Sequence, residues 1–348
     1  MKKTHLALFG MLVAGLTATN VAGLTATNVA KGEGRLVVYC SAQNVVCEKA
    51  VQGFAKKYDV KTSFIRNSSG STLAKIDAEK NNPQADVWYG GPFDTHLQAA
   101  ELGLLSPYPF PKLSEVMPQF QKLGDGKSSI VYMGVLGFGV NTERLKKLGI
   151  KDVPKCWKDL ADPRFKNEIQ MADPQSSGTA YTAIATFVQL WGEEQAFDYL
   201  KQLDQHISQY PKAGTAPSRN TARGETTVGI GFLQNYSFEK ENGAPIELVV
   251  PCEGTGYELG GISVIKDARN LKNAQLFADW VMSKEAQELS WKEAQSHHVP
   301  TNIHAEPSPY ALKPSELNLI NYDFDKFGSN EMRSHLIGKW VDKIKLNK

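Results

Sequence analysis

The sequence predicts an α/β protein of two lobes, with two paired β-strands that cross between the lobes. Short β-rich segments alternate with polar loops and helical segments, and this order indicates a parallel sheet covered by helices. The 348 residues suffice for two ordinary domains, and 41% are apolar, which excludes a disordered chain. Two glycine-rich β segments, 130–141 and 257–266, flank the middle of the chain. We interpret them as the crossing strands of a hinge, because glycine accepts backbone rotation at low steric cost; two ordinary central strands with bulges are the alternative.

The elements follow one another in a regular rhythm along the chain. In the first part, residue spacing predicts strands at 35–40, 61–66 and 85–91 and helices at 46–58, 73–80 and 95–102. The next part has predicted strands at 168–172, 227–232 and 246–251 and helices at 180–191 and 198–203. Helices follow at 274–282, 284–294 and near 331–344. We predict a first lobe of residues 31–135 plus 262–320 and a second lobe of residues 136–261, with 321–348 packing on the lobes.

The first 30 residues have the pattern of an export signal. A basic head, residues 1–3, precedes the apolar stretch 6–16, which is too short to span a bilayer comfortably. The eight residues GLTATNVA at 15–22 recur at 23–30. We expect a cleaved signal peptide of residues 1–30, with cleavage after Ala22 and a retained membrane anchor as alternatives. No cysteine follows closely enough for a lipid anchor, so we expect a soluble product. Export through the signal gives the periplasm as its expected location.

The charge balance argues against a polyanion-binding surface over the whole protein, and we expect no nucleic-acid partner. The full chain has 39 Lys and Arg residues and 37 Asp and Glu residues. Lys2 and Lys3 lie in the predicted signal, and their removal leaves 37 basic residues, which balance the 37 acidic ones. An anionic ligand must therefore be attracted by local groups such as helix ends, hydroxyls and single arginines.

The four cysteines all lie after the predicted signal. An even number of cysteines in an exported chain indicates two disulfides, and these cysteines lack the spacing of a zinc site. Three pairings are open to four cysteines. The short separation of Cys40 and Cys47 favours the pairs Cys40–Cys47 and Cys156–Cys252.

The most informative pattern is a set of three strand-to-helix junctions, at 41–44, 68–72 and 176–179, that are rich in small hydroxyl residues, amides and glycine. A helix start carries unpaired N–H groups and a partial positive charge, and hydroxyls add donors, so such a junction suits an anion. Plain N-caps are the alternative at any one junction. Three junctions that face one cleft would form a neutral cradle for a phosphate-sized anion. Arg219 or Arg223 would add a fork onto the phosphate, or would form a surface ion pair, Arg219 with Glu225 for example.

Enzyme templates fail in this sequence. It has no GxSxG elbow and no HExxH motif, and the nearest P-loop and GxGxxG matches, at 126–128 and 137–142, break the required spacing. We therefore expect a protein that is not an enzyme and that holds no cofactor and no metal.

Several histidines and aromatic residues are candidates for the cleft or the core. His297 and His298 form a pair in a polar stretch and are expected at the surface. His206, in the segment DQHISQY, is a candidate to bind a hydroxyl, or else a solvated or capping histidine. At the end of the strand 85–91, Trp88 is expected in the core and Tyr89, on the opposite face, in the cleft.

Five segments carry a resemblance to a known family. They are, in order, RLVVYCSAQN, ADVWYGG, YMGVLGFGVN, DPQSSGTAY and VGIGFLQNYS. Over nearly the whole chain after the signal, the sequence resembles the periplasmic solute-binding proteins of ABC importers, specifically the ferric-binding-protein-like group. The resemblance implies a type II binding-protein fold, two α/β lobes that close around one ligand, a monomeric state, and a membrane permease with its ATPase as partners.

The chain departs from the iron-binding members of that group where they bind the metal. Those members typically have His or Gln after the first strand, an acidic residue after the WY-type strand, and a Tyr-Tyr pair in the NYS region. The matching positions here hold Gln43 or Asn44, Gly90-Gly91, and Tyr236-Ser237. Because Fe³⁺ prefers several anionic oxygens, one remaining tyrosine would hold it poorly. The Ser-Gly junction that binds an anion in the family is intact.

The sequence also looks like the subgroup of these receptors that binds phosphorylated sugars, with a hexose phosphate such as glucose 6-phosphate as ligand. The expected phosphate contacts are Ser69, Gly70, Ser71, Ser177, Gly178, Thr179 and Arg219. The expected contacts of the sugar and the cleft are Ser41, Gln43, Asn44, Tyr89, Gly90, Gly91, His206, Asn235, Tyr236 and Glu253. The alternatives are a ferric-ion receptor that uses Tyr236 with a synergistic anion, and a receptor for free phosphate or a phosphonate such as 2-aminoethylphosphonate.

Overall fold

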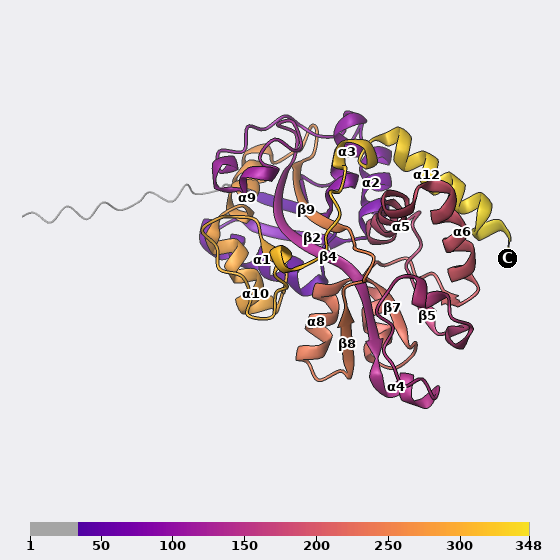
Figure 1. Ribbon diagram of the computed structural model, residues 1–348. Helices are drawn as coiled ribbons and strands as arrows, with labels where there is room; N and C mark the ends of the chain where they lie inside the picture. The colour runs from indigo at the N-terminus through magenta and orange to yellow at the C-terminus, as the bar shows by residue number, and fades with distance from the viewer. Residues whose placement is uncertain (1–33, 348) are drawn as a thin grey trace, which may run out of the picture. The chain divides into compact units, whose positions relative to one another are not determined.

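The computed structural model describes residues 34–347, so the predicted signal peptide 1–30 lies outside the described residues. Ten strands of the described chain form one mixed sheet in the order β2-β1-β3-β9-β4-β7-β5-β6, and β8 and β10 also pair with β4 (Figure 1). The strands are β1 Arg35–Cys40, β2 Lys61–Arg66, β3 Val87–Pro92, β4 Ser129–Asn141, β5 Ile169–Gln170, β6 Ile207–Gln209, β7 Val228–Phe232, β8 Ile246–Val249, β9 Tyr257–Val264 and β10 Val299–Pro300.

The sheet is parallel on its two sides and antiparallel in its centre. Strand β1 pairs parallel with β2 and β3, and β5 pairs parallel with β6 and β7. The central pairs β3–β9, β9–β4 and β4–β7 are antiparallel. The predicted α/β class is therefore confirmed, with a parallel group of strands on each side of the crossing strands.

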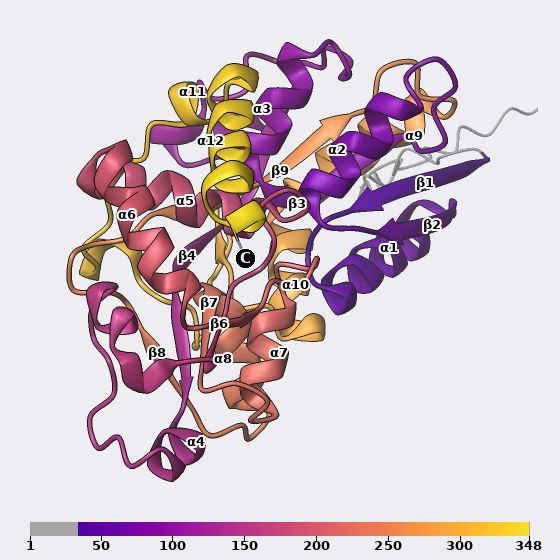
Figure 2. The same cartoon turned by 90° about the vertical axis from the view of Figure 1, so that its right-hand side faces the viewer.

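Helices cover both groups of strands. They are α1 Asn44–Tyr58, α2 Ser69–Ala78, α3 Phe93–Glu101, α4 Thr142–Lys147, α5 Gly178–Trp191, α6 Glu193–Asp204, α7 Ala216–Ala222, α8 Leu233–Glu241, α9 Leu271–Val281, α10 Lys284–Ala294, α11 Phe324–Phe327 and α12 Asn330–Lys343. The C-terminal helix α12 contacts α5 and α6 (Figure 2). None of the described helices is long and apolar enough to cross a membrane.

Local sequence accounts for most helix limits, with one instructive exception. Helix α10 has the predicted bounds, and Ser283 caps it by accepting a hydrogen bond from the amide of Ala286 at 3.3 Å. Helix α2 begins at Ser69, four residues before the predicted start. Its first turn is the polar segment that we interpreted as a loop, and Ser69 is 3% exposed because this turn packs on other parts of the chain. Tertiary contacts thus extend a helix into a sequence of low helix propensity.

Strand β4 runs through both groups of strands. Its residues up to Val135 pair with β9, and its residues from Leu136 onward pair with β7 and β8. Strand β9 pairs with β3 and with the first part of β4. The chain returns beside the crossing point, where the amide of Leu136 donates to the carbonyl of Gly256 at 3.1 Å. The boundaries of the two lobes stay a prediction, since the described chain forms one compact unit.

Glycines in the crossing strands provide room for side chains. A Cβ atom added to Gly134 in β4 would collide with the amide group of Gln234 from α8. At Gly260 in β9, it would collide with the ring of Tyr132. Neither glycine has a positive φ angle. The structure thus gives these glycines a packing role in addition to the hinge role that we inferred from their flexibility.

Both predicted disulfides are present in the structure. Cys40 is bonded to Cys47, and Cys156 is bonded to Cys252. The first bond joins the end of β1 to the first turns of α1 and therefore braces the turn between them. The second bond closes a loop with a sequence separation of 96 residues in the second half of the chain.

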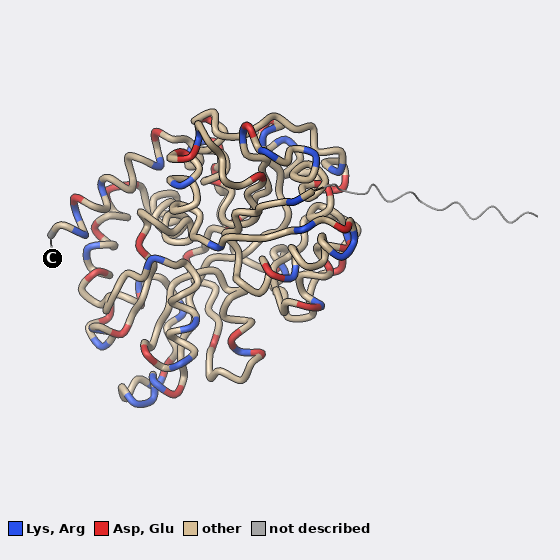
Figure 3. Tube along the Cα trace, turned by 180° about the vertical axis from the view of Figure 1, so that it is seen from behind, with Lys and Arg blue, Asp and Glu red and all other residues tan. Residues whose placement is uncertain are grey.

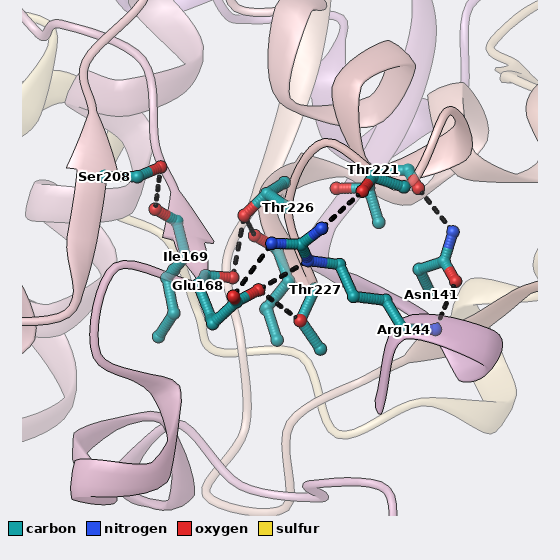
Figure 4. Close-up of polar contacts among 10 residues, drawn as sticks. Asn141, Arg144, Glu168, Ile169, Ser208, Thr221, Thr226 and Thr227 are labelled. Carbon is teal, nitrogen blue, oxygen red and sulfur yellow. Dashed lines mark hydrogen bonds and ion pairs between the residues drawn. The ribbon is translucent and has the colours of Figure 1, made fainter. Parts of the chain in front are cut away.

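A polar network holds α4 beside β5, β7 and α7 (Figure 4). The guanidinium of Arg144 binds both carboxylate oxygens of Glu168, at 2.7 and 2.9 Å, and donates to the carbonyl of Gly224 at 2.8 Å. The hydroxyl of Thr227 donates to the same carboxylate at 2.5 Å. Asn141 caps α4 and also donates to the carbonyl of Thr221 at the end of α7. This network fixes the helix α7 that carries Arg219.

Candidate ligand-binding site

A cavity lies where the helix starts of both strand groups meet. The lining residues are Ser41, Ala42, Gln43, Arg66, Ser68, Ser69, Pro92, Tyr132, Ser177, Gly178, Thr179, Gly214, Thr215, Phe232, Gln234, Asn235, Glu258 and His298. The three junctions predicted from the sequence are therefore brought together, because each contributes at least two of these residues.

The start of α5 supplies donors to this cavity. Ser177 is the N-cap and accepts a hydrogen bond from the amide of Ala180 at 3.4 Å. The amide of Gly178 donates to Ser69 Oγ at 3.1 Å. Among the described residues, neither the amide nor the hydroxyl of Thr179 has a hydrogen-bond partner. Thr179 thus presents two free donors at the positive end of a 14-residue helix.

Arg66 gives the cavity lining a positive charge. It is the last residue of β2, and its Nε donates to the carbonyl of Ala42 at 3.1 Å. Its other guanidinium nitrogens have no hydrogen-bond partner in the described part of the chain. Burial, and next the charge of Arg219, lower the pKa of Arg66. A guanidinium group with free donors beside a free helix start suits an anion, and Arg219 adds positive charge nearby.

Arg219 is not among the residues that line the cavity. It is exposed on α7, and its Nη1 donates to Thr215 Oγ1 at 3.2 Å. The expected ion pair with Glu225 is formed by Arg223 instead, at 3.3 Å. The sequence analysis missed Arg66, although a charged residue at the carboxyl end of a parallel strand is where open α/β sheets bind ligands.

One group of lining residues, Glu258, Gln234 and His298, is polar and uncharged near neutral pH. Glu258 is 4% exposed, and burial raises the pKa of its carboxyl to about 8. Gln234 Nε2 donates to Glu258 Oε1 at 2.8 Å, and the buried Oε1 of Gln234 has no partner in the part of the chain that the structure describes. His298 Nε2 lies 3.8 Å from the Glu258 carboxyl, and burial lowers the pKa of this histidine to about 3. These three side chains offer hydrogen bonds to neutral hydroxyl groups.

The expectation that His297 and His298 lie at the surface is wrong. They are 4% and 9% exposed, respectively. His297 binds Ser308 and Glu241, each at 2.8 Å, and His298 contacts the Tyr132 ring with centroids 4.0 Å apart. Short-range sequence gives no sign of this burial, since the pair follows α10 in a polar segment that packs on β4 through β10.

The expected role of Gly90 and Gly91 as open space for a sugar does not match their surroundings. Both have positive φ angles, of 77° and 85°. A Cβ at Gly90 would lie 2.9 Å from the Cβ of Ala42, and one at Gly91 would lie 2.8 Å from the Cβ of Ser41. The glycines allow the cavity-lining turn 41–43 to sit against β3. Trp88, buried as expected, fixes the same turn by donating from its Nε1 to Ser41 Oγ at 3.0 Å.

Other candidates lie beside the cavity and do not line it. Asn44 and Ser71 are exposed at the starts of α1 and α2. Gly70 faces the backbone carbonyls of 175 and 176. Tyr89 borders a neighbouring space lined by Val46, Ala50 and Trp280 among others.

Two of the candidates expected to bind sugar hydroxyls from the second lobe, His206 and Glu253, lie elsewhere. His206 is 7% exposed and interacts with the carbonyl of Ala161 at 3.1 Å. The Glu253 carboxylate accepts hydrogen bonds from the amides of Trp157, at 2.7 Å, and Lys158, at 3.0 Å. Glu253 therefore binds the loop next to the Cys156–Cys252 disulfide. Neither side chain is among those that line the cavity.

Tyr236, the residue on which iron binding would depend, is buried against the crossing strand β4. Its side chain is fully buried against Gly139 and Gly229, and its hydroxyl has no partner among residues 34–347. Burial raises the pKa of Tyr236 well above its ordinary value, so the phenol stays protonated. The cavity itself holds one carboxyl group, Glu258, whose raised pKa keeps it neutral. These donors suit an anion with hydroxyl groups and not a hard trivalent cation.

An α/β sheet with a crossing strand and a cavity lined by helix starts defines the class of type II periplasmic solute-binding proteins. Residues 82–326 match the family described as bacterial extracellular solute-binding protein, and the chain belongs to this family. Solute-binding proteins of this class deliver small molecules to the permease of an ABC importer.

Three relatives support this assignment. A Haemophilus influenzae protein is 62% identical over 341 residues, which are 97% of this chain and 96% of the relative. The periplasmic binding protein AfuA from Actinobacillus pleuropneumoniae, solved with exogenous fructose 6-phosphate bound, is 64% identical. Its TM-score is 0.89 over 90% of this chain and 100% of that chain. Iron-bound HitA from Pseudomonas aeruginosa, at 21% identity, shares the fold with a TM-score of 0.75 over 89% of this chain and 99% of that one.

Proposed function

We propose that this protein is the periplasmic receptor of an ABC importer for a phosphorylated sugar. The ligand is a hexose phosphate, such as glucose 6-phosphate or the fructose 6-phosphate found in AfuA. The observation that carries the proposal is the composition of the cavity lining, which combines Arg66 and a free helix start with the neutral side chains Glu258, Gln234 and His298. The partners are the inner-membrane permease and its ATPase, and the receptor acts as a monomer without a catalytic step.

Arg66 and the start of α5 account for binding of the phosphate. Removing a dianion from water is costly unless each oxygen is paired, so the site must cover the phosphate with donors. Arg66 supplies a charged fork, and Thr179 supplies an amide and a hydroxyl at the start of α5. Ser41 and Ser177, which carry hydroxyl groups, also line the cavity. Since the chain after the predicted signal carries no net charge, this local charge provides the attraction; Figure 3 shows acidic and basic residues mixed along the chain.

The uncharged lining residues account for binding of the sugar. A protonated Glu258 donates one hydrogen bond and avoids repulsion with the phosphate, which an ionised carboxylate would create. Gln234 keeps a free carbonyl oxygen, and Asn235 lies beside it on α8. Among the described residues Gln234 Oε1 has no partner, and free phosphate would leave it unpaired, so the site should favour a polyhydroxylated ligand.

Thermal unfolding with a panel of compounds tests the proposal. The panel is glucose 6-phosphate, fructose 6-phosphate, glucose, inorganic phosphate, 2-aminoethylphosphonate and Fe³⁺ with citrate. A ligand that binds only the folded state adds about 2.7 kcal/mol of stability at a hundredfold excess over its Kd. We expect this shift with hexose phosphates and not with glucose. A shift with phosphonate alone, or with iron together with a tyrosinate–iron colour, would overturn the proposal.

A matched pair of variants tests whether Arg66 binds the phosphate. Arg66→Met should weaken binding of a hexose phosphate by about tenfold to a hundredfold, because a hydrogen bond to a charged group is worth about 1.5–3 kcal/mol. Arg269→Met, on the exposed surface, is the control and should bind as the native protein does. Equal affinities of the two variants, measured by calorimetry, would remove Arg66 from the site.

A further inference from the structure

We propose that Arg219 speeds the association of the ligand with this receptor and makes no contact with the ligand once it is bound. The inference rests on the proposed function, because it concerns a phosphorylated solute at the same cavity. Arg219 is exposed on α7, and its Nη1 donates to Thr215 Oγ1 at 3.2 Å. Thr215 lines the cavity, and Arg219 does not. The charge of Arg219 therefore lies beside the lining and stays in contact with solvent.

Exposure divides the lining residues into two groups. The group that keeps partial contact with solvent, which we call the entrance, consists of Ser41, Gln43, Arg66, Ser68, Thr179 and Thr215. The buried group includes Gln234, Asn235, Glu258 and His298, which are between 4% and 9% exposed. A solute that arrives from solvent therefore meets the entrance first, and the entrance includes the hydrogen-bond partner of Arg219.

Arg219 and Arg66 carry charges that no carboxylate pairs with in the described chain. Among residues 34–347, the arginines that form ion pairs are Arg144, Arg164 and Arg223. Burial is the main cause of the lowered pKa of Arg66, and the charge of Arg219 is the next cause. The two guanidinium groups thus lie close enough for their fields to add at the entrance.

Other charges cancel little of this local field. Glu239 on α8 is half-buried; burial raises the pKa of its carboxyl, and Arg219 and Arg223 lower it in part. Because neither arginine forms an ion pair with Glu239 in the described chain, this acid offsets their charge only in part. The chain after the predicted signal carries no net charge, so no strong field of the whole protein competes. A dianion in solvent is therefore attracted to the entrance.

A charge beside the lining acts on the rate of association. A unit charge about 10 Å from a phosphate dianion in water raises the local concentration of the dianion up to about fourfold at low salt. Charges at the rim of a binding surface typically change the association rate and its salt dependence, whereas charges buried against the ligand change the dissociation rate. Arg219 belongs to the first kind, and Arg66, which lines the cavity, belongs to the second.

Stopped-flow fluorescence with glucose 6-phosphate measures both rates, and Trp88, which donates to the cavity-lining Ser41, is a natural reporter. At about 10 mM salt, Arg219→Met should associate about twofold to fourfold more slowly than the native protein, with an unchanged dissociation rate. At about 1 M salt, where the Debye length is about 3 Å, the two association rates should converge. Arg219→Lys keeps the charge without the planar fork and should associate at the native rate.

Arg269→Met is the matched control, since it also removes one exposed positive charge. Arg269 donates to Asn82 at 2.6 Å, and Asn82 follows the end of α2 that is opposite to the cavity-lining Ser69. Helix α2 has 10 residues, which corresponds to a length of about 15 Å. The control should associate at nearly the native rate, and it separates a local effect of charge from an effect of the total charge.

Two results would overturn the role of Arg219. An association rate of Arg219→Met equal to the native rate at low salt would mean that this charge does not attract the ligand. Faster dissociation of both Arg219→Met and Arg219→Lys would place the guanidinium in contact with the bound ligand. Circular dichroism establishes that each variant is folded.

The role of Arg219 and the proposed function fail in different ways. If hexose phosphates bind and Arg219→Met associates at the native rate, only the role of Arg219 is wrong. If 2-aminoethylphosphonate or inorganic phosphate binds instead, the proposed function is wrong, and the same rates measured with that anion decide the role of Arg219, because the attraction depends on the charge of the solute. Binding of glucose and of none of the anions would overturn both.

Discussion

Glu258→Gln should remove a large dependence of stability on pH. Burial raises the pKa of this carboxyl from 4.5 to about 8, so between these values the folded protein holds a proton that the unfolded chain releases. The free energy of unfolding therefore falls as pH rises through this window. A shift of about 3.5 pKa units corresponds to about 5 kcal/mol. Glutamine has nearly the same shape and does not ionise, so the variant should lack this loss.

Urea denaturation of the ligand-free proteins between pH 4.5 and 8.5 measures the effect. The native protein should lose stability relative to Glu258→Gln steadily up to about pH 8 and then level off. His298 titrates at lower pH in both proteins, since its pKa is lowered to about 3, and its contribution largely cancels in the comparison. A difference between the two proteins that does not vary with pH would refute the assignment of Glu258 as a neutral carboxyl.

Three further changes have defined outcomes. Thr179→Val removes a free hydroxyl and should weaken hexose-phosphate binding about tenfold in calorimetry, with an unchanged unfolding midpoint; equal affinity would mean that the phosphate lies elsewhere. Replacing Cys156 and Cys252 by serine opens a loop with a separation of 96 residues and should cost up to about 4–5 kcal/mol in urea denaturation; no loss would contradict the chain-entropy argument. Glu168→Gln breaks the bidentate pair with Arg144 and should cost about 1–3 kcal/mol at neutral pH. Burial raises the pKa of Glu168, but its hydrogen bonds lower it by more, so this pKa lies below its ordinary value. The stabilisation should therefore disappear in acid, where the carboxylate is protonated. A cost that persists in acid would point to packing instead.

The sequence predicted elements whose limits are written locally. Strands 35–40 and 61–66 and helix 284–294 have the predicted bounds, because alternation, helical spacing and capping residues determine them. Helix α6 begins at Glu193 and not near 198, since Gly192 ends α5 and the next helix starts at once. The early start of α2 comes from tertiary packing, which local propensity does not contain.

The candidate site was predictable only in part. The three junctions carry a local signature of small hydroxyl residues and glycine, and they do converge on the cavity. Arg66, Glu258 and His298 carry none, because each lies at a strand end, inside a strand or in a loop, and only the sheet order brings them together. Glu253 and His206 had suitable chemistry, but their backbone positions direct them to the loop 157–161.

The glycines of β4 have a consequence for how ligand choice and movement are related. Gly134 of β4 leaves room for the side chain of Gln234, and β4 also carries Tyr132. Both side chains line the cavity, so the strand that joins the two groups of strands also forms a wall of the cavity. Any force that a ligand exerts on this wall acts directly on the connecting strand. Evolution of a new ligand preference through this wall would therefore change the energy of bending at the same time, whereas Thr179 lies on α5, outside this strand.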